Sequence, residues 1–278
     1  MIRNYYKPAI IALPLFLGAC ATVVPTQYTN KTAAFDAVAA GANKSIGKKT
    51  VWIQSQQQAK ANAKRVHAMV HKKNISAETA VQVALLNNKG LQAIYAEVGL
   101  SAAEVWQEAL PENPIVSIGI FGIAAPELGV FRAIEGMFAT NLLDTKTRKQ
   151  RVALADTQFK KSQLNAVNET LKLASKTRQA WIKAVSAFEA VGNLKRASAT
   201  SDASSELAQS LGLAGSLDKG SQAREHAFNA DLAAQTAKAR LEAAGAKAEL
   251  TRLMGLWGTE VDYFVPKALP RLPKSIPR

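Results

Sequence analysis

The side chains best suited to chemistry are the three histidines of the chain. His67 and His71 lie four residues apart, a spacing that places two side chains on one face of a helix and suits metal ligation. Two ligands are too few for a metal site, and no nearby Cys, Asp or Glu completes one. His226 follows Glu225, but nothing else around this pair forms an acid–base site. We therefore predict histidines on solvated helix faces, no catalytic residues, no metal site and no cofactor, and hence a protein that is not an enzyme.

The one cysteine, Cys20, follows a segment of the secretory type. Residues 1–19 begin with basic residues and continue with an apolar run that is too short to span a membrane. The run ends in Leu17-Gly18-Ala19-Cys20, which resembles the bacterial lipobox, where cleavage precedes a cysteine that receives lipid. The alternative is an ordinary signal peptide followed by an incidental cysteine. We predict a signal peptide over 1–19 and lipidation at Cys20. In bacterial lipoproteins an aspartate after the lipidated cysteine commonly retains the protein at the inner membrane. Since Ala21 stands there, we predict an outer-membrane anchor.

Long helices must organise the rest of the chain. No proline lies between Glu127 and Val265, and strong helix formers dominate residues 144–255. The pattern predicts a helix over 144–211, which would be roughly 100 Å long at about 1.5 Å per residue, a tip over 211–218 and a returning helix over 218–255. The residues of this tip are Leu211, Gly212, Leu213, Ala214, Gly215, Ser216, Leu217 and Asp218. Its two glycines can take the positive φ that ends a helix, and its aspartate can cap the next one.

Shorter elements precede the long helix. We predict a tether over 20–53, a helix over 54–75 and a second helix over 76–110, capped by Ser76 and weakened at Asn87-Asn88. The helices over 76–110 and 218–255 together nearly match the long helix in length. Two short helices stacked end to end would therefore flank its two halves.

Two stretches between the helices favour strands. Residues 115–121 form a β-branched run, and residues 129–140 alternate imperfectly, with Val130, Ile134 and Phe138 on one face. The predicted fold is mainly α with a short β-hairpin: a long antiparallel helical hairpin plus two strands of an oligomeric transmembrane β-barrel. The alternative is a soluble hairpin that caps the helices. A proline-rich tail over 259–278 closes the chain.

These residues resemble the TolC-like outer-membrane efflux protein family. The resemblance runs from about Gly47 to the end of the chain and includes one efflux repeat over 76–258. Its most specific piece is Ala80 to Pro114, with Leu85 and Asn88 in the helix and Asn113-Pro114 before the first strand. It implies a passive channel component of a tripartite efflux system, with a periplasmic adaptor at the tip and an inner-membrane pump as partners. Exported small solutes or metal ions would be its cargo. Gly220 and Ser221 depart slightly from the family pattern just after the tip.

The chain carries one such repeat where the family usually carries two. Six copies could form the usual barrel, a second half-chain could supply the missing repeat, or the chain could be a truncated, nonfunctional product. A separate alternative is a lipid-anchored periplasmic coiled-coil scaffold. The net charge of +14 raises nucleic acid as a partner, but the basic residues are dispersed and no aromatic platform accompanies them, so we expect none.

Overall fold

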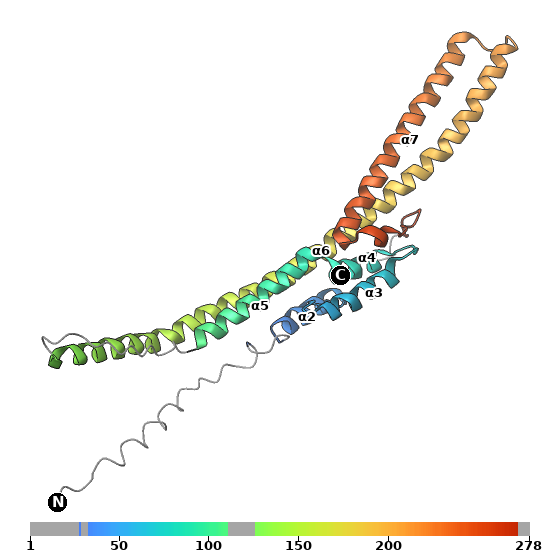
Figure 1. Ribbon diagram of the computed structural model, residues 1–278. Helices are drawn as coiled ribbons and strands as arrows, with labels where there is room; N and C mark the ends of the chain where they lie inside the picture. The colour runs from blue at the N-terminus through green and yellow to red at the C-terminus, as the bar shows by residue number, and fades with distance from the viewer. Residues whose placement is uncertain (1–27, 29–32, 111–125, 272–278) are drawn as a thin grey trace, which may run out of the picture. The chain divides into compact units, whose positions relative to one another are not determined.

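The computed structural model describes residue 28 and residues 33–110 and 126–271, with the side chains described from residue 146 onward in the second of these ranges (Figure 1). The described part of the chain is mainly helical, and it contains no strand apart from one isolated parallel bridge between Asn74 and Phe264. The elements in chain order are α2 (Ala33–Ile46), α3 (Gln56–Val70), α4 (Ala77–Asn87), α5 (Lys89–Ala109), α6 (Pro126–Leu213), α7 (Lys219–Met254) and the short 3-10 helix η2 (Gly258–Val261). The expected signal peptide, Cys20 and the strand over 115–121 lie outside the described residues.

The strand expected over 129–140 is wrong, because these residues belong to the 88-residue helix α6. Pro126 stands at the start of α6, where its fixed φ favours a helix and its missing N–H costs nothing. The apolar residues Val130, Ile134 and Phe138 are spaced by four. That spacing fits one face of a helix as well as one face of a strand, and with no further proline or turn the helical period prevails.

The helix expected over 76–110 is two helices. Asn88 ends α4 with an extended ψ of 119°, and α5 begins at the next residue. The pair Asn87-Asn88 followed by Gly90 has low helix propensity, which explains why the chain breaks here. Within the described ranges, no helix is both long enough and apolar enough to cross a membrane.

The chain divides into two compact units, Met1–Val38 with Tyr95–Ala166 and Ala39–Ile94 with Val167–Arg278. In the first unit, the greater part of α5 runs along the N-terminal half of α6 (Figure 1). Glu108 and Arg151 form an ion pair of 2.9 Å between these helices. Phe35 from the start of α2 packs edge-on against the buried ring of Tyr95, with centroids 4.7 Å apart.

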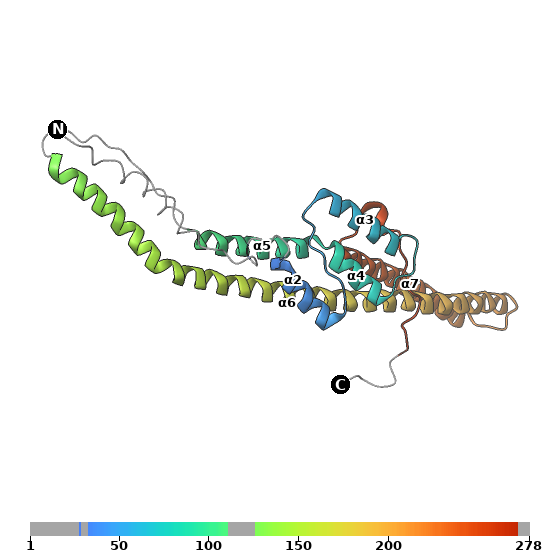
Figure 2. The same cartoon turned by 90° about the horizontal axis from the view of Figure 1, so that it is seen from below.

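The second unit holds the larger core. Side chains from α3, α4, the middle of α6 and the end of α7 meet around Trp181, whose indole N–H donates to the carbonyl oxygen of Ile75 at 2.9 Å. Trp181 therefore serves packing, and its one polar atom has a backbone partner. Beyond this core, α7 and the C-terminal half of α6 form an antiparallel helical hairpin (Figures 1 and 2). A smaller cluster around Val191, Ala239 and Ala243 holds that hairpin together.

A segment over 47–54, which is neither helix nor strand, is held on α4 and the start of α5 by two glutamine side chains. The Gln82 amide accepts from the N–H of Lys49 at 3.2 Å and donates to its carbonyl oxygen at 2.7 Å. The Gln92 amide accepts from the N–H of Ile53 at 2.9 Å and donates to the carbonyl oxygen of Val51 at 2.7 Å. Each glutamine thus satisfies an N–H and a C=O of a segment that has no sheet to pair with.

Candidate functional site

The hairpin tip is a compact turn that ends α6 with a Schellman motif. The N–H of Ser216 donates to the carbonyl oxygen of Leu211 at 2.8 Å, and the N–H of Gly215 donates to that of Gly212 at 3.1 Å. Gly215 takes the left-handed conformation, with φ of 72°. The expected positive φ at Gly215 is therefore present, whereas Gly212 still belongs to the helix.

Asp218 caps the returning helix. Its carboxylate accepts from the N–H of Ser221 at 2.9 Å and from the Ser221 hydroxyl at 2.6 Å. The hydroxyl bond, followed by the backbone bond, lowers the pKa of Asp218 from its ordinary value. Ser221 is thus the residue that satisfies the cap. Arg224 in turn donates to the Ser221 hydroxyl at 2.8 Å.

The tip presents apolar side chains to its surroundings. Leu213 is 86% exposed and Leu211 is 39% exposed. Gly212 has a different role, because a Cβ there would overlap the amide nitrogen of Gln222, which donates to the carbonyl oxygen of Leu217 at 3.0 Å. Glycine at this position makes room for the Gln222 side chain and its bond to Leu217. Leu213 is the most exposed leucine of the tip.

Polar pairs join the two helices below the tip. Asp202 accepts from the Asn229 amide at 3.0 Å, and the Ser205 hydroxyl lies 2.7 Å from Nδ1 of His226. The His226 ring is therefore hydrogen-bonded to the opposite helix, although His226 is an exposed residue. This end of the hairpin is held by hydrogen bonds more than by a large apolar core, which makes its packing weaker than that around Trp181.

The second feature is the junction at which α7 ends against the break between α4 and α5. The Asn87 amide donates to the carbonyl oxygen of Gly255 at 2.7 Å, and the Asn88 amide donates to that of Leu253 at 3.0 Å. The side-chain oxygen of Asn88 accepts from the N–H of Leu91 at 3.0 Å. These bonds satisfy carbonyl groups at the end of α7 and an N–H at the start of α5, all of which lack partners within their own helices.

Gly255 fits this junction for two reasons. It ends α7 in the left-handed conformation, with φ of 67°. A Cβ at this position would lie 2.6 Å from the backbone oxygen of Asn87 and 3.2 Å from the Cα of Asn88. Backbone atoms cannot move aside as a flexible side chain can, so the close approach of the two segments requires glycine.

The segment after α7 is also anchored. Phe264 pairs with the loop between α3 and α4, donating from its N–H to the carbonyl oxygen of Lys73 at 2.9 Å and accepting from the N–H of Ile75 at 2.9 Å. The buried Tyr263 hydroxyl lies 2.8 Å from the Thr251 hydroxyl, and burial raises the pKa of Tyr263 to about 12. The start of the proline-rich tail is therefore part of the core, a role that its proline content did not indicate.

The other predicted site residues fall in three groups. Leu85 is fully buried, and its role is packing. Asn88 forms the junction, whereas Cys20, Asn113 and Pro114 lie outside the described residues, and lipidation at Cys20 stays a prediction. The rings of His67, in the last turn of α3, and His71, which ends that helix, stack with centroids 4.4 Å apart. No described group of three or more His, Cys, Asp or Glu side chains could hold a metal ion.

Sequence reasoning singled out the tip and the soft spot at Asn87-Asn88 but missed what these asparagines bind. A signal was present, because an amide at a helix break next to a glycine that ends another helix suits capping. No family model, curated protein sequence or solved structure matches this chain.

Proposed function

We propose that this chain forms part of the helical wall of an outer-membrane efflux conduit, a passive path for exported small solutes or metal ions. The observation that carries the proposal is the junction at Asn87-Asn88. There α7, which returns along the second half of α6, ends, and α5, which accompanies the first half of α6, begins. One long helix accompanied in turn by two shorter ones is the arrangement implied by the resemblance to TolC-like efflux proteins.

A conduit wall needs lateral partners, and α6 exposes three large apolar side chains on one side. Ile182 is 45% exposed, Leu207 is 59% exposed and Leu211 is 39% exposed. They are separated by close to whole numbers of turns at about 3.6 residues per turn, so they lie on one side of the helix. We propose further copies of this chain, or a second half-chain, as the partner that covers this face.

The tip is proposed as the contact with a periplasmic adaptor, which would link the conduit to an inner-membrane pump. Leu213 supports this assignment because an apolar side chain that projects from a rigid turn suits a docking contact. The Schellman motif and the Asp218 cap fix the backbone around it. Docking would therefore cost little ordering entropy.

The mass of the detergent-extracted full chain tests the assembly. The chain is expressed without a partner protein and with residues 1–19 retained, and the mass is measured by light scattering. A closed assembly of several copies is the expected result. A monomer under conditions that keep the helical circular dichroism spectrum intact would overturn the homo-oligomer, and a monomer even beside a co-expressed second repeat would overturn the conduit.

Export tests the tip. Leu213→Asp is expected to abolish export through an intact pump while leaving the fold and the mass of the assembly unchanged, because the side chain contributes little to packing. Leu241→Asp is the matched control, since Leu241 is 75% exposed on α7 away from the tip. Normal export by the Leu213→Asp variant would refute docking at the tip.

A second candidate function is a lipid-anchored periplasmic scaffold. The observation that favours it is the helical conformation of residues 129–140, where the conduit hypothesis expected a strand. A membrane-bound chain that never assembles into a closed oligomer and whose deletion leaves export intact would favour this candidate.

A further inference from the structure

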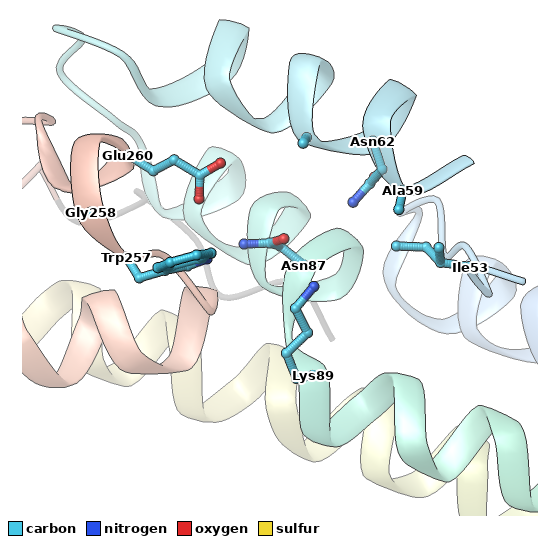
Figure 3. Close-up of a pocket in the computed structure, with 9 residues that line it drawn as sticks. Ile53, Ala59, Asn62, Asn87, Lys89, Trp257, Gly258 and Glu260 are labelled. Atoms are coloured by element: carbon cyan, nitrogen blue, oxygen red, sulfur yellow. The ribbon is translucent and has the colours of Figure 1, made fainter. Parts of the chain in front are cut away.

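A pocket of about 360 Å³ lies beside the junction in the second unit, between α3, α4 and the segment that follows α7 (Figure 3). Its volume is in the lower range for small-molecule sites in proteins. The residues that line it are Ile53, Ala59, Asn62, Ala63, Asn87, Lys89, Trp257, Gly258 and Glu260. None of these residues belongs to the tip or to the exposed face of α6 at which we propose lateral partners.

The pocket carries two opposite charges that have no partner among the described residues. The Glu260 carboxylate and the Lys89 ammonium point toward the same space from different elements, on either side of Asn87 (Figure 3). They form no ion pair with each other or with any other described side chain. A ligand that bears one negative and one positive group could satisfy both.

Two buried amides add acceptors to the pocket. Asn62 is 8% exposed and Asn87 is 7% exposed, and both use their N–H groups on backbone carbonyl oxygens. Among the described residues, none donates a hydrogen bond to their side-chain oxygens. These oxygens are also not fully enclosed by protein atoms. They are left able to accept hydrogen bonds from a ligand, as an ammonium group requires.

Trp257 supplies an aromatic face. Its side chain is 77% exposed, and the indole extends into the pocket toward Asn87 (Figure 3). An indole left this exposed gains from covering by an apolar group or a cation. The η2 helix that follows places Glu260 on the same side of the pocket.

We propose that this pocket binds a small zwitterion of the α-amino acid class. The ammonium group of the ligand lies against Glu260 and the side-chain oxygens of Asn62 and Asn87. Its carboxylate lies against Lys89, and its apolar side chain covers Trp257. This inference stands apart from the proposed conduit, because binding at the pocket requires neither assembly nor export.

Isothermal titration of the full-length protein with three probes tests the proposal. L-leucine carries both charges, L-leucinamide lacks the carboxylate, and N-acetyl-L-leucine lacks the ammonium. L-leucine is expected to bind with a dissociation constant in the millimolar range or below, and each of the other two about tenfold more weakly. The absence of saturable binding of L-leucine, or equal binding of all three probes, would overturn the proposal.

Variants assign each charge. Glu260→Gln is expected to weaken L-leucine binding about tenfold, and Lys89→Met is expected to remove the preference for L-leucine over L-leucinamide. Trp257→Ala weakens all three probes together. Glu242→Gln and Lys238→Met, at exposed positions on α7, are the matched controls and leave binding unchanged. Wild-type affinity in the Glu260→Gln variant would exclude this pocket as the site.

Discussion

The side-chain amide of Asn88 joins the ends of three helices. Its nitrogen donates to the carbonyl oxygen of Leu253 in the last turn of α7, and its oxygen accepts from the N–H of Leu91 in the first turn of α5. Asn88 itself ends α4, since its own N–H donates to the carbonyl oxygen of Ala84. The two bonds need a donor and an acceptor on separate atoms of one short side chain, and the asparagine amide supplies both.

Asn88→Asp separates these two roles. The variant keeps the acceptor for Leu91 but loses the donor, and it places a negative charge against the carbonyl end of α7, where the helix dipole disfavours it. We expect a loss of about 1 to 3 kcal/mol in the stability of the junction, measured by hydrogen exchange of the amides in the last turns of α7. Asn168→Asp, on an exposed position of α6, is the control. Unchanged exchange in Asn88→Asp would show that the bond to Leu253 contributes nothing.

Gly255→Ala brings a methyl group against backbone. A Cβ would lie 2.6 Å from the oxygen of Asn87, and the residue would also pay for its positive φ. We expect destabilisation of about 2 to 4 kcal/mol. Gly245→Ala is the matched control within α7: nothing lies within 4 Å of its Cβ position, so it should gain about 0.5 to 1 kcal/mol of helix stability. Urea denaturation of both variants gives the comparison, and an equal shift in the two would refute the close-approach argument.

Tyr263 predicts a loss of stability in alkali. Its pKa is raised from 10.0 to about 12 because burial disfavours the phenolate. Since the folded pKa lies above the unfolded one, this contribution is fully present below pH 10 and is lost as the pH rises toward about 12. Tyr263→Phe should show a smaller fall in stability over this range than the wild type, measured by thermal unfolding at stepped pH. Parallel falls in both proteins would mean that another group controls the transition.

Gly215 and Gly255 end their helices with the same motif but in different surroundings. No atom lies within 4 Å of a Cβ built on Gly215, so Gly215→Ala pays only for its positive φ, about 1 to 2 kcal/mol. Gly215→Asn should cost less, because asparagine tolerates this conformation. Gly192→Ala, inside α6 and also unobstructed, is the control. Thermal unfolding of the set measures the cost, and a larger loss for asparagine than for alanine would contradict the prediction.

Ile182 and Leu207 lie on one exposed face of α6, and this face predicts where an assembly should fail. The double variant Ile182→Lys and Leu207→Lys places charges where we propose a second copy, so it should reduce the oligomer to smaller species without loss of helical signal. Ala199→Lys, at an exposed position about 100° around the helix from this face, should leave the assembly intact. Light scattering of the detergent-extracted proteins measures both outcomes, and an unchanged mass for the double variant would place the interface elsewhere.

Sequence patterns anticipate the long helices, because strong helix formers dominate them and no proline interrupts them after their first residue. Asp218 and Gly255 cap α7 as their types suggest, because capping is a local property of the chain. The strand over 129–140 could not be excluded from sequence, since apolar residues spaced by four fit both periods. The bonds of Asn87, Asn88 and Gln92 join residues far apart in the chain, and a one-dimensional pattern does not reveal such partners.

The hydrogen bonds that Gln82 and Gln92 form with the backbone have a mechanical consequence. Gln82 and Gln92 hold the segment over 47–54 at Lys49 and at Val51 with Ile53, each through one donated and one accepted hydrogen bond. Tension arriving from the N-terminal side would therefore reach these four bonds before it reached α3. The load would pass through Gln82 into α4 and through Gln92 into the start of α5. These bonds would therefore protect α3 from the tension.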